Sequence, residues 1–339
     1  MSRTVNNRRR SILIAGVGSI GERHLRCFAA TGRVDVSFCE VNAELLRTIA
    51  ERYQVRKAYD DLDEALAEQP TAVVICTPAH LHVPMALRAA AVGAHLLIEK
   101  PLSTNFDGLV DLQKAITARN LVAAVAYVYR AHPVLAAMRE ALHSERFGKP
   151  LQIVCTSGQN FPFYRPAYRQ TYYRDRATGG GAVQDALTHI INAGEWLVGP
   201  VDRLVADLDH KALAGVEVED TVHVLTRHGS VMGCFSLNQH QAANESTITV
   251  ICERGTARFE YHHSHWRWIT EPGTEWHDEP AASLERDTLF IRQAESFLGA
   301  IAGANPVLCP LEEAAQTLRV NLAILASSEK RGWENVGKE

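Results

Sequence analysis

The sequence predicts an α/β protein of two domains, in which a parallel sheet is followed by a mostly antiparallel one. In the first part of the chain, short runs rich in Val, Ile and Leu alternate with amphipathic, helix-like segments. Strands that alternate with helices imply βαβ units and hence a parallel sheet. After about residue 128, strand-like runs follow one another across glycine-containing turns with almost no helix between them. This pattern indicates an antiparallel sheet in a domain of α+β type.

The first domain is predicted over residues 11–128. Its apolar runs are nearly continuous, which is typical of strands covered by helices on both faces. The expected strands are SILIAG, VDVSFCE, AVVICTP, HLLIEKP and LVAAVAYVY. The second domain is predicted over residues 129–339, and alternating segments such as 221–224 indicate that its strands have one more and one less buried face. Two amphipathic helices, at about 285–303 and 311–331, close the chain.

The composition is that of an ordinary globular protein, and 339 residues are comfortable for two domains. A net charge of −4 gives no reason to expect nucleic acid or an anionic membrane as a partner. No run reaches the ~18 apolar residues that a membrane span needs. Seven cysteines are scattered without a CxxC pair, and several lie inside apolar runs. We therefore expect reduced, buried thiols and a cytoplasmic protein.

Residues 1–10 are predicted to form a disordered basic tail. Arg8, Arg9 and Arg10 precede the apolar stretch SILIAGVGSIG, in the manner of a secretory signal. That stretch is only a few residues long before its glycines, however, and no small-residue cleavage site follows it. The same residues also form the glycine motif described next, so their removal would destroy it.

A glycine-rich turn follows the first strand and opens the first helix, with the pattern GxGxxG at Gly16, Gly18 and Gly21. The first glycine permits the tight turn, the second lets the backbone approach a pyrophosphate, and the third allows close helix–strand packing. Glu40 ends the next strand, where a carboxylate can accept both ribose hydroxyls of NAD and would repel the 2′-phosphate of NADP. We therefore expect a Rossmann domain that binds NAD, with NADP less favoured, through a loop that includes Ser19 and Ile20.

Further cofactor contacts are expected where other parallel strands end, because a dinucleotide lies at the carboxyl edge of such a sheet. The residues predicted for this edge are Cys76, Thr77, Pro78, His82, Glu99 and Lys100. His80 and His82 could instead be polar residues on the approach to a helix. An HxH pair without further ligands is poor evidence for a metal, and the same holds for His263 and His265. No metal is expected.

Two segments carry residues suited to acid–base chemistry. Lys100 follows an apolar strand and precedes Pro101, which restrains the following turn. Three glycines at 179–181 lead into a helix that places Asp185 and His189 at positions i and i+4. An aspartate beside a histidine orients the ring and suits proton transfer near neutral pH. Taken alone, such a pair is more often an ordinary surface feature.

In this order, the motifs resemble those of the glucose–fructose oxidoreductase, inositol dehydrogenase and MocA family (Gfo/Idh/MocA). The resemblance rests on the glycine motif, Thr77-Pro78, Glu99-Lys100-Pro101, Arg130-Ala131-His132-Pro133 and the segment from Gly179 to His189. It implies a second domain with a large, open, mostly antiparallel sheet that commonly makes subunit contacts. It also implies a catalytic set carried here by Lys100, Asp185 and His189. Gln184 departs from the family, in which an apolar or aromatic residue usually precedes the aspartate.

The expected activity is oxidation of a secondary hydroxyl on a sugar, sugar derivative or polyol by hydride transfer to NAD. His189 would act as general base, Lys100 would hydrogen-bond the reacting oxygen, and Asp185 would orient the pair. The segment GSIGERHLR and the Tyr- and Arg-rich stretch ahead of the glycines look similar to members that act on amino-sugars or nucleotide-sugars. The alternatives are a redox-assisted glycoside hydrolase, a sugar–sugar oxidoreductase with tightly bound NAD(P), and a cofactor-sensing protein without catalysis.

The stretch 160–174 concentrates aromatic residues, arginines and prolines immediately before the glycines. Its prolines argue against a regular helix or a central strand. Aromatic faces suit a sugar ring or a base, and arginines suit a carboxylate or phosphate. The predicted substrate contacts are Tyr164, Arg165, Arg169 and Gln184, together with Lys100, Asp185 and His189. Alternatively, the loop packs against a neighbouring subunit.

Strands between about 201 and 271 have too little helix nearby to cover both faces of their sheet. We therefore expect one face to be buried by another subunit, in a homodimer or homotetramer.

Overall fold

The computed structural model describes residues 10–337. The predicted basic tail therefore lies outside the described residues, except for Arg10. That residue was wrongly placed in the tail, because it begins the first strand, β1 (Arg10–Ala15), and pairs with Val34 on the neighbouring strand. By its contacts the chain divides into two compact units. The first comprises residues up to Glu99, Phe106–Ala126 and Arg286–Leu311, and the second contains Lys100–Asn105, Tyr127–Glu285 and the chain from Glu312 onward.

The first unit holds a six-stranded sheet in the order β3-β2-β1-β4-β5-β6, and all five of its pairings are parallel. Its strands are β1, β2 (Val34–Cys39), β3 (Ala58–Tyr59), β4 (Ala72–Ile75), β5 (His95–Ile98) and β6 (Ala123–Val125). The order reverses beside β1, as in doubly wound folds. The parallel sheet confirms the predicted fold class. Two details differ, because β3 is only two residues long and β6 ends at Val125 where the sequence predicted a longer strand.

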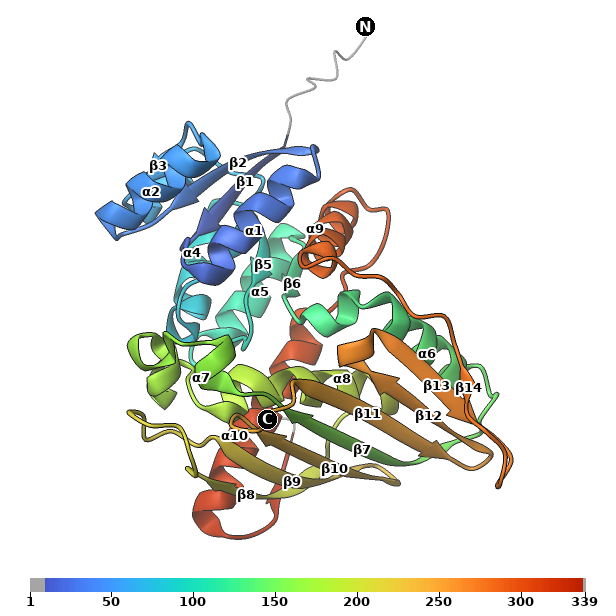
Figure 1. The fold of residues 1–339 in the computed structure, drawn as a ribbon. Coiled ribbons are helices and arrows are strands. Elements are labelled where there is room, and N and C mark those ends of the chain that lie inside the picture. The colour runs from blue at the N-terminus through green and yellow to red at the C-terminus, as the bar shows by residue number, and fades with distance from the viewer. Residues whose placement is uncertain (1–9, 338–339) are drawn as a thin grey trace, which may run out of the picture. The chain divides into compact units, whose positions relative to one another are not determined.

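The helices of this unit are α1 (Ser19–Ala30), α2 (Ala43–Tyr53), α3 (Leu62–Ala67), α4 (His82–Ala91), α5 (Leu109–Arg119) and α9 (Thr288–Ile301). Helix α9 returns from late in the sequence, and Figure 1 shows it in orange close to α1. Its Phe297 and Leu298 join Phe28 of α1 in the buried core. Asp287, just before α9, accepts two hydrogen bonds from Arg26 at 2.5 and 2.8 Å. The sequence had assigned this helix to the range of the second domain.

The second unit is built on a nine-stranded sheet in the order β14-β13-β12-β11-β7-β10-β9-β8-β15. The pair β7–β10 is parallel and every other pairing is antiparallel. The strands are β7 (Pro150–Gly158), β8 (Arg203–Asp209), β9 (Thr221–His228), β10 (Val231–Asn238), β11 (Glu245–Cys252), β12 (Gly255–Glu260), β13 (His265–Ile269), β14 (His277–Asp278) and β15 (Glu334–Asn335). The predicted mostly antiparallel sheet is thus confirmed.

Helices α6 (Pro133–His143), α8 (Thr188–Val198) and α10 (Leu311–Lys330) lie along one face of this sheet (Figure 1). They share a core with the inward side chains of the strands, among them Phe235 and Phe259. Burial alternates along β9, where Val222 and Val224 are buried and Leu225 is 52% exposed. The outward apolar residues Leu151 and Met232, on β7 and β10, are also exposed.

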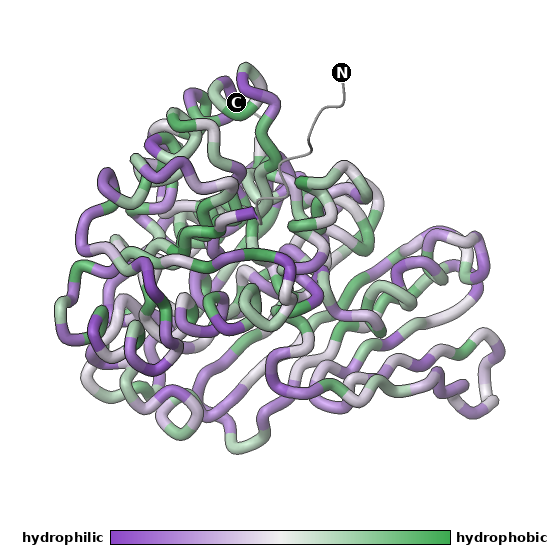
Figure 2. The backbone as a smooth tube through the Cα atoms, turned by 90° about the horizontal axis from the view of Figure 1, so that it is seen from above, coloured by the Kyte–Doolittle hydropathy of each residue, from purple (hydrophilic) through white to green (hydrophobic). Residues whose placement is uncertain are grey.

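Hydrophilic and hydrophobic stretches alternate along the chain in Figure 2, and extended apolar segments are rare. Within residues 10–337, no helix is both long and apolar enough to cross a membrane.

Candidate active site

The glycine turn between β1 and α1 has the geometry that its sequence predicted. Gly16 adopts a φ of +85°, which favours glycine, and its amide donates to the carbonyl of Cys39 at 2.8 Å. A side chain at Gly21 would lie 1.9 Å from the carbonyl oxygen of Gly16, so only glycine lets α1 pack this closely. A side chain at Gly18 would meet nothing within 4 Å. The space at Gly18, at the N-terminus of α1, therefore serves no packing of the chain itself and fits a bound pyrophosphate.

Glu40 follows β2 and points back to this turn. Its Oε2 accepts from the amide of Val17 at 3.0 Å, and its Oε1 accepts from the amide of Asn42 at 2.9 Å. The two bonds fix the carboxylate beside the glycine turn. Each oxygen has a second lone pair, so the group retains the capacity to accept ribose hydroxyls. The donors, the acceptor and the open space together fit NAD.

The end of β4 leads into a turn that His82 stabilises. Cys76 is buried, and Pro78 precedes a short 3₁₀ turn that continues into α4. His82 is 1% exposed, and its Nε2–H donates to the carbonyl of Thr77 at 2.8 Å. His80 is exposed. The structure thus gives His82 a role in holding the turn that carries Thr77 and Pro78.

Glu99 is buried and forms a hydrogen bond with a histidine of α1. Nε2 of His24 donates to Oε1 of Glu99 at 2.6 Å, and the two side chains are 1% and 6% exposed. The pair joins the helix that follows the glycine turn to the end of β5. The sequence did not indicate this contact, which gives Glu99 a structural role.

Lys100 and Asp185 lie together although they are 85 positions apart. Nζ of Lys100 donates to the carbonyl oxygen of Asp185 at 2.7 Å and to its Oδ1 at 3.1 Å. The side chains are 14% and 8% exposed. Two contacts to one residue hold the ammonium group in a defined position.

The phenol of Tyr172 completes the surroundings of this carboxylate, donating to Oδ1 of Asp185 at 2.6 Å. Burial acts to raise the pKa of the Asp185 carboxyl, but Lys100, Arg165 and the Tyr172 hydroxyl outweigh it and hold the pKa at about 2. Asp185 is therefore an anion over the whole working range of pH. The sequence analysis did not single out Tyr172, because nothing in the spacing distinguishes it from the other tyrosines of its segment.

Close packing within the chain explains two of the three glycines ahead of Asp185, and the third, Gly179, adopts a φ of +96°, which favours glycine. A side chain at Gly180 would lie 2.2 Å from the carbonyl oxygen of Tyr173, and one at Gly181 would lie 2.4 Å from the carboxylate of Glu219. Glu219 is 1% exposed and accepts from the amide of Val183 at 3.1 Å. Gly180 and Gly181 thus let the tyrosine segment and Glu219 pack against the start of the helix that carries Asp185.

The predicted regular helix begins with a wider turn. Residues Val183–Leu187 form a π-helix and α8 follows from Thr188, so Asp185 and His189 lie in helices of different pitch. Such turns are frequent at functional sites. The Asp185 carboxylate contacts Lys100 and Tyr172, whereas the ring of the half-buried His189 stacks on Tyr129 with centroids 5.7 Å apart.

The predicted substrate loop is made of short turns rather than irregular chain. It contains the single helical turn α7 (Phe161–Tyr164), whose Pro162 occupies the first turn, where proline is tolerated. Tyr164 and Arg165 are exposed. Arg165 lies near enough to Asp185 to lower the pKa of its carboxyl.

Arg169 and Gln184 bond within the chain. Nε of Arg169 donates to the carbonyl of Ala214 at 2.7 Å, and the guanidinium lies over the ring of Tyr168. The amide of Gln184, which is 2% exposed, donates to the carbonyl of Arg176 at 3.0 Å. Both residues therefore support the loop.

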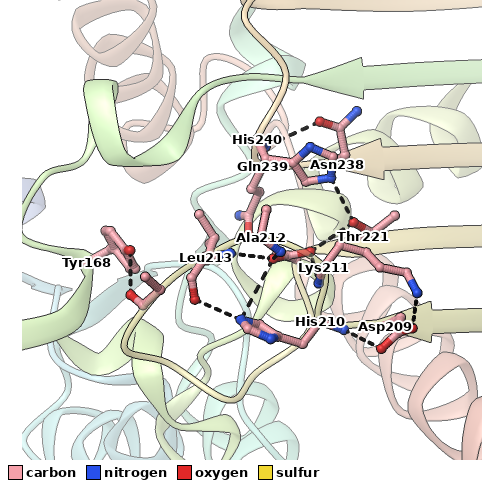
Figure 3. A network of polar contacts seen from close by, with 12 residues as sticks. Tyr168, Asp209, His210, Lys211, Ala212, Leu213, Thr221, Asn238, Gln239 and His240 are labelled. Carbon is pink, nitrogen blue, oxygen red and sulfur yellow. Dashed lines mark hydrogen bonds and ion pairs between the residues drawn. The ribbon is translucent and has the colours of Figure 1, made fainter.

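A buried aspartate fixes the segment to which this loop is bonded, and Figure 3 shows Lys211, Ala212 and Leu213 of that segment. Asp220 is fully buried, and its carboxylate accepts from the amides of Lys211, Ala212 and Leu213 at 2.9, 2.7 and 2.8 Å. The phenol of Tyr168 donates to the next carbonyl, that of Ala214, at 2.7 Å. The tyrosine loop is thereby tied to the segment between β8 and β9.

Among residues 10–337, no group of three or more His, Cys, Asp or Glu side chains is placed to hold a metal ion.

A doubly wound domain with this glycine turn and acidic residue defines a dinucleotide-binding oxidoreductase. Two family models match the chain. One, described as an oxidoreductase family with an NAD-binding Rossmann fold, matches residues 10–127. The other, the GFO/IDH/MocA C-terminal domain, matches residues 135–258. The chain belongs to the GFO/IDH/MocA family of NAD-binding oxidoreductases.

Relatives from two bacteria match over nearly the whole chain. Levoglucosan dehydrogenase of Pseudarthrobacter phenanthrenivorans is 24% identical over 95% of this chain and 97% of that protein. UDP-N-acetylglucosamine 3-dehydrogenase of Acidithiobacillus ferrooxidans is 26% identical over 87% of this chain and 90% of that protein.

Solved structures share the fold. A levoglucosan dehydrogenase in complex with NADH gives a TM-score of 0.89 at 22% identity, covering 97% of this chain and all of that one. The WlbA dehydrogenase from Bordetella pertussis, in complex with NADH and UDP-GlcNAcA, gives 0.85 at 22% identity, covering 98% and 99%.

Proposed function

We propose that the protein is an NAD-dependent dehydrogenase that oxidises a secondary hydroxyl of a sugar, sugar derivative or polyol. The observation that carries the proposal is the buried pair of Lys100 and Asp185. Asp185 lies four residues before His189, and the chain has an NAD-binding fold. The two contacts of Lys100 to one aspartate hold its ammonium group in a defined position, which suits it to act on a substrate oxygen. The names of the relatives, which are dehydrogenases of sugars, support this class of substrate.

In the proposed reaction, His189 accepts the proton of the substrate hydroxyl. Lys100 donates a hydrogen bond to the same oxygen and stabilises the negative charge that develops there. Asp185 stays ionised and holds the Lys100 ammonium through its carboxylate and its carbonyl oxygen. NAD, when bound, supplies the hydride acceptor.

The cofactor would be held by the turn between β1 and α1 and by the ends of the neighbouring strands. Glu40 would accept the ribose hydroxyls and favour NAD over NADP. The residues assigned to this role are Gly16, Gly18, Ser19, Ile20, Gly21, Glu40, Cys76, Thr77, Pro78 and Lys100, with His82 and Glu99 supporting them from behind.

We further propose that Tyr164 and Arg165 contact the substrate and that the enzyme works in the cytoplasm as a homodimer or homotetramer. Tyr164 and Arg165 are exposed on the loop beside Asp185. Assembly is supported by the outward face of the nine-stranded sheet, where Leu151, Leu225 and Met232 are about half exposed. Apolar side chains gathered on one sheet face are typical of a subunit interface.

The proposal is tested by mixing the purified protein with NAD and a panel of anhydrosugars, polyols, free sugars and nucleotide-sugars, and following NADH absorbance. We expect one class to be oxidised by the wild type and by Lys114→Met, which changes an exposed lysine on α5. Lys100→Met should lose ~10²–10⁴ in kcat. Hydrolysis of a glycoside without net NADH, or equal activity of Lys100→Met, would contradict the proposal.

A further inference from the structure

Two tyrosines of the segment after β6 lie against the ring of His189. Tyr129 stacks on the imidazole, with centroids 5.7 Å apart and planes inclined by 20°. Tyr127 meets the same ring edge-on, at 6.1 Å and 87°. The ring is therefore bounded by two aromatic side chains that belong to one short piece of chain.

The stack continues beyond Tyr129. Tyr261, in a 3₁₀ turn after β12, lies on Tyr129 at 4.8 Å with an angle of only 9° between the rings. His189, Tyr129 and Tyr261 thus form a column of three rings. Tyr261 in turn packs edge-on against Phe259, a fully buried residue of β12, at 6.3 Å. The column therefore ends on the core of the nine-stranded sheet.

Tyr127 is anchored independently of this column. Its side chain is fully buried, and its hydroxyl lies 2.9 Å from Oγ1 of Thr188, the residue before His189. Nδ2 of Asn321 on α10 donates to the same Oγ1 at 2.9 Å. The edge of Tyr127 thus presents a fixed wall to the imidazole.

We propose that Tyr129 is a positioning residue that, backed by Tyr261, fixes the plane of the His189 ring for proton transfer. An imidazole exchanges its proton along a line in the plane of the ring, and the outer torsion of histidine is otherwise broad. A ring stacked on one face stops the imidazole from turning out of that plane. The inference rests on the proposed role of His189 as proton acceptor.

Kinetics of three variants test the proposal. Tyr129→Phe keeps the stacked ring and should retain nearly the wild-type kcat. Tyr129→Leu keeps apolar bulk but removes the ring, and should lose about tenfold to a hundredfold in kcat with little change in KM, because the loss is one of orientation. Tyr261→Leu, one ring further out, should show a smaller loss of the same kind. Equal losses in the Leu and Phe variants of Tyr129 would overturn the proposal.

A second measurement needs no turnover. Diethyl pyrocarbonate modifies exposed imidazoles, and peptide mass spectrometry gives the rate at His189 itself. We expect severalfold faster modification in Tyr129→Leu than in wild type or Tyr129→Phe, with the fold of each variant checked by thermal unfolding. An unchanged rate in Tyr129→Leu would show that the stack does not hold the ring. Faster modification in Tyr129→Leu with unchanged kcat would show that the stack holds the ring without contributing to turnover; the positioning role would then be overturned, while the proposed dehydrogenase activity, which is tested by Lys100→Met, would stand.

Discussion

Replacing Asp185 by Asn should remove a measurable, pH-dependent part of the stability of the second unit. The pKa of this carboxyl falls from its ordinary 3.8 to about 2 in the folded chain. At 1.36 kcal/mol per pKa unit, the ionised form stabilises the fold by about 2 kcal/mol. A group whose pKa is lowered on folding gives this stabilisation above its ordinary pKa and loses it as the pH falls through the folded value. At pH 3, about 1 kcal/mol should already be lost.

The assay is urea unfolding followed by tryptophan fluorescence at pH 6 and pH 3. All five tryptophans of the chain lie between residues 196 and 333 in the second unit, so the signal reports on the unit that contains Asp185. Between the two pH values, the wild type should lose about 1 kcal/mol more than Asp185→Asn. Tyr172→Phe, which removes one donor to the carboxylate, should fall between them.

Asp207→Asn, which changes an exposed residue of β8, is the matched control and should follow the wild type. If wild type and Asp185→Asn lose equal stability between pH 6 and pH 3, the reasoning that Lys100, Arg165 and Tyr172 hold Asp185 as an anion is refuted.

Four further outcomes follow from the structure. Glu40→Ser should narrow the preference for NAD over NADP in kcat/KM, and equal use of both cofactors by the wild type would contradict the role of the carboxylate. His189→Ala should lose ~10²–10⁴ in kcat while NADH binding, measured by fluorescence titration, stays unchanged. Arg165→Ala should raise KM for an anionic sugar derivative more than for its neutral parent, and an equal rise in KM for both substrates would favour a neutral polyol as substrate. Arg169→Ala, which loses the bond to Ala214, should change KM for both substrates alike. Leu225→Glu on the outward sheet face should shift the assembly toward monomer in light scattering, and a wild type that is monomeric at micromolar concentration would remove the predicted interface.

The sequence predicts well those features that depend only on residues close to one another in the chain. The turn at Gly16 requires a positive φ, the packing at Gly21 requires a bare Cα, and Glu40 follows one strand later. Each of these demands is visible in the residue types alone. The alternation of buried and exposed residues along β9 is local in the same sense.

Contacts between distant segments could not be predicted from the segments themselves. Lys100 and Asp185 were placed in one set only through the resemblance to the family, because each segment alone is compatible with an ordinary surface residue. Tyr172 could not be distinguished from Tyr164, Tyr168 or Tyr173, because the choice depends on successive 3₁₀ turns. Glu99 was assigned to the cofactor edge, but its buried partner His24 lies on a helix face that periodicity marks only as inward.

The two arginines of the loop are a further case in which the sequence could not distinguish neighbouring residues of one type. Arginines in a loop before a catalytic helix suggest recognition of an anion, and the sequence treats Arg165 and Arg169 alike. The structure distinguishes them. Arg169 donates a hydrogen bond to the carbonyl of Ala214, whereas the charge of Arg165 lowers the pKa of the Asp185 carboxyl. Such a distinction depends on a segment more than forty residues away.

Because helix α9 belongs to the first unit but comes late in the sequence, it determines when that unit can complete its folding during synthesis. A ribosome that has released residues up to Ala126 has delivered all six strands of the first sheet but not Phe297 and Leu298. Until residue 301 emerges, Phe28 lacks the α9 side chains of Phe297 and Leu298, which share its core in the folded unit. Because domains usually fold one after another as they are synthesised, this unit must instead wait, incomplete, while more than 150 residues of its neighbour are made. A nascent chain stalled when Ala126 has just left the ribosome should therefore be captured by chaperones and cut by proteases far more readily than one stalled after Leu311 has left it.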